Sequence, residues 1–254
     1  MNQTNDPAIL LKDLWFSYDG DPVLEEVNLS IPQGDFVSIV GPNGGGKTTL
    51  LKLMLGLLRP SRGEVRIFGE SPEAARPRVG YMPQQTELDP QFPATVMDVA
   101  LMGRLGHGRP FGRYSRHDRE VAAQALDQVG LRDVFRKPFS SISGGQRQRL
   151  FIARALACEP DLLLLDEPTA NLDVVMGGDL YDLLRTLNAT LTVVTVSHDV
   201  GFVSTVVKSV VCVKRKVFMH PTSEITGEMI NALYGSPVRM VRHNGEEGCT
   251  CYNS

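Results

Sequence analysis

The chain has 254 residues, of which 42% are hydrophobic, enough to bury a full core as one large domain. Its 26 Lys and Arg against 29 Asp and Glu give a formal net charge of −3, so no basic excess favours a nucleic-acid partner and we expect none. No apolar run approaches the roughly 20 residues that a membrane helix needs. Residues 1–7 lack a basic segment followed by an apolar block, so we do not expect secretion.

The first part of the chain has a strand-like pattern. Short apolar runs on either side of a turn at residues 19–22 predict a small antiparallel sheet. Further strands are predicted at 35–40, 63–69 and 79–82, and helices at 49–58, 95–105 and 118–129. Residues 103–112 carry Gly and Pro together with Arg104 and Arg109, and we expect an exposed basic loop there.

The second part alternates between helix and strand. The pattern predicts helices at 146–157 and 174–187 and a fully buried strand at 161–166. β-Branched runs predict strands at 191–197 and 209–214, for which we expect parallel pairing. A last helix is predicted at 224–234, followed by a polar tail that we leave unstructured.

A glycine-rich segment at residues 41–49 has the spacing of a phosphate-binding loop, with a predicted strand before it and a predicted helix after it. Backbone N–H groups of such a loop, and the positive end of the helix dipole, point at phosphate oxygens. Lys47 supplies a cation for the outer phosphates, and the Thr48 hydroxyl is placed to bind Mg²⁺. The nucleotide-binding candidates are Gly41, Pro42, Asn43, Gly44, Gly45, Gly46, Lys47, Thr48 and Thr49.

Two acidic residues, Asp166 and Glu167, follow the four leucines of the buried strand predicted at 161–166. A strand end next to the phosphate loop delivers a carboxylate to the metal, so we expect Asp166 to hold Mg²⁺ directly or through water. Glu167 follows at once and is our candidate general base for the attacking water.

A second glycine element opens the helix predicted at 146–157. It consists of Ser143, Gly144, Gly145 and Gln146, which can bind an anion at a helix N-terminus. The element has neither a lysine nor a preceding buried strand, so it cannot be a second complete nucleotide site.

Together these residues resemble the nucleotide-binding subunit of ATP-binding cassette (ABC) transporters, and residues 143–146 of this chain match the signature of that family. The resemblance covers nearly the whole chain. It implies an α/β P-loop NTPase core, with a mostly parallel sheet flanked by helices, an N-terminal antiparallel β subdomain and an inserted α-helical subdomain. The expected single domain is 1–234, with core segments 1–84 and 160–220, helical subdomain 85–159 and a flexible tail 235–254. The resemblance also implies ATP and Mg²⁺ as ligands, and a head-to-tail homodimer in which the signature of one subunit closes over the ATP of the other.

Two further roles follow from the resemblance near the nucleotide. Tyr18 resembles the aromatic residue that stacks on adenine, with Trp15 in that role, or simple packing of Tyr18 in the sheet, as the competing readings. Gln84 matches the glutamine that reaches Mg²⁺ and the attacking water and senses the membrane partner, with Gln85 as its rival.

The resemblance assigns two more residues in the second half. Asp173 fits the aspartate that communicates across the dimer, and His198 fits the switch histidine at the γ-phosphate. The chain departs from the family pattern at Gly45, where a small non-glycine residue is frequent, and at Ile142, where leucine is commoner.

The chain holds one cassette and no predicted membrane span, which favours an importer subunit that docks on a separate permease near residues 84–112. Residues 87–104 and 197–234 resemble zinc and manganese uptake ATPases. The alternatives are a siderophore or cobalamin importer and a soluble regulatory ATPase without a permease. We expect a peripheral location at the cytoplasmic face of the membrane and an indirect partner in an extracytoplasmic substrate-binding protein. Cys249, Cys251 and His243 in the tail suggest a metal site, but flexible thiols without a second ligand pair are more often not one.

Overall fold

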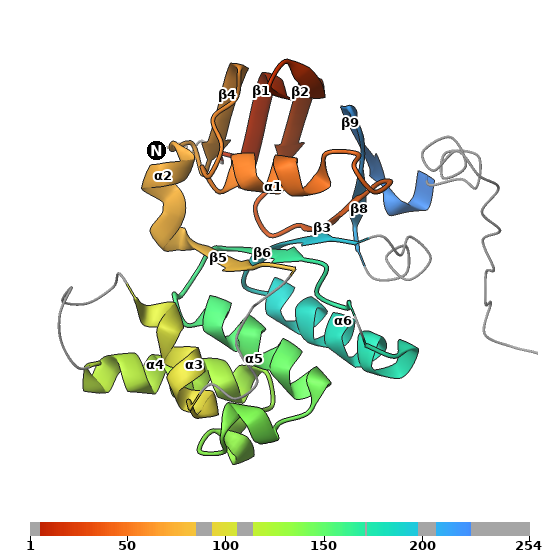
Figure 1. Ribbon diagram of the computed structural model, residues 1–254. Helices are drawn as coiled ribbons and strands as arrows, with labels where there is room; N and C mark the ends of the chain where they lie inside the picture. The colour runs from red at the N-terminus through yellow and green to blue at the C-terminus, as the bar shows by residue number, and fades with distance from the viewer. Residues whose placement is uncertain (1–5, 85–92, 106–113, 171, 198–206, 225–254) are drawn as a thin grey trace, which may run out of the picture.

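The computed structural model describes residues 6–84, 93–105, 114–170, 172–197 and 207–224. Two sheets organise these residues (Figure 1). The smaller sheet is antiparallel and has the order β2-β1-β4, formed by β1 (Ile9–Tyr18), β2 (Asp21–Ile31) and β4 (Arg62–Ile67). It is the antiparallel sheet that the sequence predicts.

The larger sheet has six strands in the order β5-β6-β7-β3-β8-β9, and all its pairings are parallel except that of β8 with β9. Its inner strands β3, β6 and β7 are buried along their whole length, which suits their unbroken apolar sequences. The strands are β3 (Phe36–Val40), β5 (Val79–Met82), β6 (Leu162–Asp166), β7 (Thr192–Val196), β8 (Ser209–Lys214) and β9 (Lys216–Pro221).

The helices divide between the two faces of the larger sheet. Helix α1 (Lys47–Met54) lies between the two sheets, and the other long helices lie on the opposite face (Figure 1). That second group consists of α3 (Val96–Leu101), α4 (Arg116–Gln128), α5 (Gly144–Leu156) and α6 (Val174–Asn188). Shorter elements are α2 (Pro72–Ala75) and the 3-10 turns η1 (Arg76–Arg78), η2 (Met102–Arg104), η3 (Arg132–Val134), η4 (Phe139–Ser141) and η5 (Thr222–Glu224).

Each face of the larger sheet contributes to a separate hydrophobic core. Successive side chains of a strand point to opposite faces, so Leu163 and Leu165 join the core under α3–α6 while Leu162 and Leu164 join the core around α1. The four leucines of β6 therefore pack in both cores. This packing fixes the end of the strand, where Asp166 is the last residue and Glu167 follows.

The helix starts in the helical layer are encoded locally. Helices α3, α4 and α5 each begin with a capping box, in which a Ser or Thr side chain and the side chain three residues later satisfy each other's backbone N–H groups. The three boxes pair Thr95 with Asp98, Ser115 with Asp118, and Ser143 with Gln146. The serine of the second glycine element is thus also the cap of its helix.

The predicted fold class is confirmed, and the differences are local. The helix predicted at 49–58 ends at Met54, because Leu55, Leu57 and Gly56, at φ 64°, form a hydrogen-bonded turn. Strand β9 is absent from the sequence prediction. The helix predicted at 224–234 lies, after Glu224, outside the described residues. Within the described ranges, no helix combines the length and the apolar character needed to cross a membrane.

Candidate nucleotide site

The carboxyl ends of four parallel strands bring the predicted site residues to one edge of the larger sheet. The phosphate loop follows β3, Gln84 follows β5 by two residues, and Asp166 ends β6. Strands β5 and β6 are direct neighbours and β7 separates β6 from β3, so these three positions lie along the same carboxyl end of the sheet. His198, two residues after the end of β7 in the sequence, lies outside the described residues. In open parallel sheets this edge is where ligands bind.

The phosphate loop lies against the last residues of β8. A Cβ atom on Gly41 would be 2.2 Å from the carbonyl oxygen of Val213, and one on Gly45 would be 2.9 Å from the same oxygen. Both positions therefore need glycine in this conformation, which gives the departure at Gly45 a steric reason. Gly46 precedes α1 without a side-chain cap, so the first N–H groups of the helix are open to an anion.

Lys47 is folded over the loop that it belongs to. Its ammonium donates to the carbonyl oxygens of Gly41 at 2.8 Å and Pro42 at 3.0 Å, and the residue is only 6% exposed. Burial lowers the pKa of Lys47, while the nearby charges of Glu167 and Asp166 act in the opposite direction. The next residue, Thr48, is exposed on the first turn of α1, while Thr49 is buried.

Asp166 is a buried carboxylate beside a second one. Burial, and then the charge of Glu167, raise the pKa of Asp166 from 3.8 to about 6, although Lys47 and Lys52 lower it. The residue is 3% exposed. A carboxylate in this position is stabilised as an anion by a nearby cation, and an oxygen donor set of Asp166 and the exposed Thr48 hydroxyl is the kind that Mg²⁺ prefers. The residues present therefore fit a magnesium ion.

Glu167 is held in an unusual backbone conformation. Its φ of 49° is in the left-handed region, which a non-glycine residue occupies only when surrounding contacts enforce it. Its N–H donates to the carbonyl oxygen of Val196 at 3.0 Å, and its carboxylate accepts from the Gln84 amide at 3.1 Å. The structure therefore brings together Gln84 and Glu167, two of the candidates for handling the attacking water.

The second glycine element is on the other side of the larger sheet from the phosphate loop. Ser143 caps α5 by accepting from the Gln146 N–H, and Ser143 and Gly144 are exposed. Helix α5 packs in the core under the sheet, whereas α1 packs in the core between the sheets. The two candidate anion-binding elements of one chain thus belong to different layers.

The two remaining candidates lie at element ends. Asp173 caps α6 by accepting from the Met176 N–H at 2.8 Å. Tyr18 ends β1 with 44% of its surface exposed, and its ring packs edge-on against Phe16 at 4.8 Å. Phe16 pairs with Leu24, which would contact a Cβ on Gly46, so this end of β1 is beside the phosphate loop.

Trp15, the rival of Tyr18, is directed elsewhere. Its indole N–H donates to Asp13, and the residue pairs with Arg62 on the β4 side of the small sheet. Gln85, the rival of Gln84, lies outside the described residues.

The expectation that Arg104 is exposed was wrong. Arg104 is 6% exposed, and its guanidinium donates to Asp118 at 3.0 Å and to the carbonyl oxygen of Ala157 and the carboxylate of Glu159, both at 2.8 Å. The preceding Gly103 lies so close to α5 that a Cβ would be 2.0 Å from the Arg154 carbonyl oxygen. These acceptors come from distant parts of the sequence, so no local pattern predicts them. Arg109 lies outside the described residues.

One contact near the site was not predicted at all. The side-chain amide of Gln148 on α5 donates to the carbonyl oxygen of Pro168, the residue that follows Glu167. The only sequence signal for it is a polar residue on the inner part of a helix that begins at the signature.

Comparison with known proteins defines the class. The profile of the ABC transporter family matches residues 24–170, more than half of the chain. The manganese transport system ATP-binding protein MntB of Bacillus subtilis is 35% identical over 235 residues, covering 91% of this chain and 94% of MntB. The high-affinity zinc uptake system ATP-binding protein ZnuC of the same organism is 40% identical over 210 residues, covering 82% of this chain and 91% of ZnuC.

Solved structures agree. An ABC transporter in an inward-facing conformation superposes with a TM-score of 0.83 at 33% identity, covering 91% of this chain and 90% of that one. A dimeric bacterial ABC transporter cassette superposes with a TM-score of 0.71 at 31% identity, covering 84% and 98%. The chain belongs to the ABC transporter family. More closely, it is an ATPase subunit of that family, similar over most of its length to ATP-binding proteins of metal transport systems.

Proposed function

We propose that this chain binds and hydrolyses ATP to power the uptake of a divalent metal ion, zinc or manganese, through a separate membrane permease. The ATPase activity is supported by one observation: the phosphate loop, Asp166 and Glu167 lie at the same carboxyl end of the parallel strands. The metal rests on the similarity to the manganese and zinc proteins named above. We propose the cytoplasmic face of the membrane as the location, with an extracytoplasmic substrate-binding protein as an indirect partner.

In the proposed mechanism, the N–H groups of residues 41–49 bind the phosphates, and Lys47 exchanges its two loop carbonyls for phosphate oxygens. Thr48, Asp166 and Gln84 would hold Mg²⁺, which when bound neutralises charge on the β- and γ-phosphates. Tyr18 stacks on the adenine. Glu167 accepts the proton of the attacking water, and the Gln84 amide, which already contacts that carboxylate, orients it.

The second half of the site comes from another subunit in this proposal. A phosphate loop and a signature that belong to different layers of one chain suit a head-to-tail homodimer, in which residues 143–146 close over the partner's ATP. The dimeric cassette among the similar structures supports this arrangement. We assign Asp173, at the exposed start of α6, to communication across that dimer, and His198 to the γ-phosphate.

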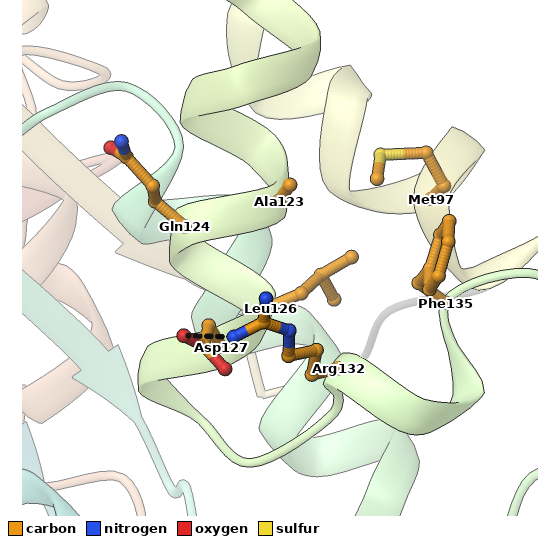
Figure 2. A pocket seen from close by; sticks show the side chains of 7 residues that line it. All are labelled: Met97, Ala123, Gln124, Leu126, Asp127, Arg132 and Phe135. Carbon is orange, nitrogen blue, oxygen red and sulfur yellow. Dashed lines mark hydrogen bonds and ion pairs between the residues drawn. The ribbon is translucent and has the colours of Figure 1, made fainter.

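We propose that the permease docks on a pocket of the helical layer. The pocket has a volume of about 350 Å³ and lies between α3, α4 and the turn at η3. Figure 2 shows its apolar part, with Met97 beside Phe135, and an ion pair of Asp127 with Arg132 at 3.5 Å on its rim. An apolar hollow with a polar rim suits a helix that inserts apolar side chains. Met97 is within the segment 84–112 expected for docking, whereas the other lining residues extend the surface onto α4 and η3.

The decisive experiment on the catalytic assignment is the Glu167→Gln variant. We expect ATP binding to be retained while steady-state hydrolysis falls by roughly a hundredfold or more, because the amide cannot accept the proton. The dimer should accumulate in the ATP-bound form, which size-exclusion chromatography detects. Hydrolysis at the parent rate would refute the assignment of Glu167.

The metal is tested in cells that lack the chain. We compare their growth in medium depleted of zinc and in medium depleted of manganese. The medium in which growth is impaired, and is restored by the parent gene but not by the Glu167→Gln variant, identifies the transported ion. Loss of growth only when iron is supplied as a siderophore, or when cobalamin is limiting, would favour the related importer group instead. Purification without any polytopic membrane protein, together with unimpaired growth in all these media, would favour a soluble regulatory ATPase.

A further inference from the structure

The signature helix touches the turn that carries Glu167. The Gln148 side chain, five residues beyond Ser143 on α5, donates its amide N–H to the carbonyl oxygen of Pro168. Pro168 is buried, and the bond lies in a partly buried region. Removing the donor from a partly buried carbonyl costs free energy, so this bond stabilises the position of the Pro168–Thr169 peptide, one residue beyond Glu167.

A second contact joins the same two parts of the chain. A Cβ on Gly145 would lie 3.3 Å from the sulfur of Met176, which is on the first turn of α6. Helix α5 is therefore close to Pro168, just after β6, and to Met176 on the first turn of α6. The helix that presents the signature thus meets the residues that follow Glu167 at two points.

The backbone of Glu167 depends on its surroundings. Its φ of 49° is maintained by the bond from its N–H to the Val196 carbonyl and by the bond that its carbonyl accepts from the Ala170 N–H at 3.1 Å. Gln148 holds the next peptide. If that peptide rotates, the carboxylate of Glu167 moves relative to the attacking water, and displacements of about 1 Å at such a position have a large effect on rate.

From these contacts we propose that Gln148 is a positioning residue for Glu167, which fixes the Glu167–Pro168 backbone relative to the signature helix. The proposal rests on the base role given to Glu167 under the proposed function. Its consequence is that the helix whose N-terminus faces the partner's ATP also sets the geometry of the carboxylate that acts on the subunit's own ATP.

The test compares side chains at position 148 in the full-length chain. Gln148→Met keeps the length of the side chain and removes the donor, whereas Gln148→Lys keeps a donor. We expect Gln148→Met to lower kcat by roughly three- to tenfold, the value of one neutral hydrogen bond, with the Kd for ATP within about twofold of the parent. Gln148→Lys should retain more of the parent kcat than Gln148→Met.

Asn188→Leu is the matched control. The Asn188 amide also donates to backbone carbonyls, those of Leu191 at 2.9 Å and Gly34 at 3.3 Å, but near the amino end of β7, at the opposite edge of the sheet. We expect it to lower Tm to a similar degree and leave kcat within about 1.5-fold of the parent.

Several results would overturn the proposal. One is a kcat of Gln148→Met within about 1.5-fold of the parent. Others are a kcat of Gln148→Lys or of Asn188→Leu that is as low as that of Gln148→Met, or a rise in the Kd for ATP that matches the loss of kcat. If Gln148→Met does not fold, Gln148→Glu takes its place, since it keeps the shape without the donor. An active Glu167→Gln variant would instead refute the base assignment, whereas an inactive Glu167→Gln with a fully active Gln148→Met refutes only this inference.

Discussion

The side-chain amide of Gln84 donates a hydrogen bond to the carboxylate of Glu167, with 3.1 Å between Nε2 and Oε2. The two residues are 83 positions apart in the sequence and follow neighbouring parallel strands, β5 and β6. Gln84 also begins the segment that leads to the proposed permease surface. A displacement of Gln84 would therefore change its hydrogen bond to the proposed general base.

Replacing Gln84 by leucine should reduce kcat by about tenfold or more, because Glu167 loses the amide that orients it and the water site loses a polar neighbour. The Kd for ATP should change by less than about threefold, since the phosphate loop is untouched. Stopped-flow nucleotide binding and steady-state ATPase assays separate the two effects. Gln85→Leu is the control, and a larger loss of kcat there would transfer the role to Gln85.

Arg104→Leu should destabilise the protein by about 1–3 kcal/mol, because the buried carbonyl oxygen of Ala157 and the carboxylates of Asp118 and Glu159 lose the donor that Arg104 supplies. The measurement is the free energy of unfolding in urea. In a double-mutant cycle with Asp118→Asn, we expect the two changes in unfolding free energy to be non-additive. Additive effects would contradict the structural role given to this ion pair.

Asp118 predicts how stability responds to acid. Hydrogen bonds from the Ser115 hydroxyl and backbone, and then the bond from Arg104, lower the pKa of Asp118 from 3.8 to about 2. Because the folded-state pKa lies below the unfolded value, the stabilisation is complete above about pH 4 and is lost as the pH falls toward 2. The difference in urea midpoint between the parent and Asp118→Asn should be constant from pH 7 to 5 and shrink below pH 4. A constant difference down to pH 2 would contradict the lowered pKa.

Ala123→Arg should block the pocket between α3 and α4. Ala123 is exposed and lines the pocket, so a long charged side chain fills the hollow without disturbing the core. We expect the ATPase activity of the isolated subunit to stay within about twofold, while its affinity for permease-containing membranes falls by about tenfold or more. Gln128→Arg adds the same charge on the same helix outside the pocket lining and should have little effect. Equal binding by the two variants would exclude the pocket as the docking surface.

The sequence predicted most of the fold because its strands and helices are encoded locally. The four leucines before Asp166 require burial on both faces, and only an inner strand of a parallel sheet offers that. Strand β9 was missed because the residue that joins it to β8 is Arg215, at φ 58°, between Lys214 and Lys216, where a glycine or asparagine would have signalled a hairpin.

The site was predictable where a motif has fixed spacing, and unpredictable where distant residues meet. Spacing was enough to nominate Lys47 and Thr48 in one segment and Asp166 with Glu167 in another. Arg104 was misjudged because arginine in a glycine-rich segment is usually solvated, and its three acceptors are 14, 53 and 55 residues away. The contact of Gln148 with Pro168 escaped prediction for the same reason, since it depends on how α5 packs against the end of β6.

The close approach of Gly103 to α5 and the anchoring of Arg104 have a mechanical consequence. Because η2 is tied to the carboxyl end of α5 and to Glu159, we expect a force at the proposed docking pocket beside α3 to turn the helical layer as a block. Helix α5 has 13 residues and is about 20 Å long, so a small rotation of that block about its Ala157 end would displace Ser143 by a larger distance.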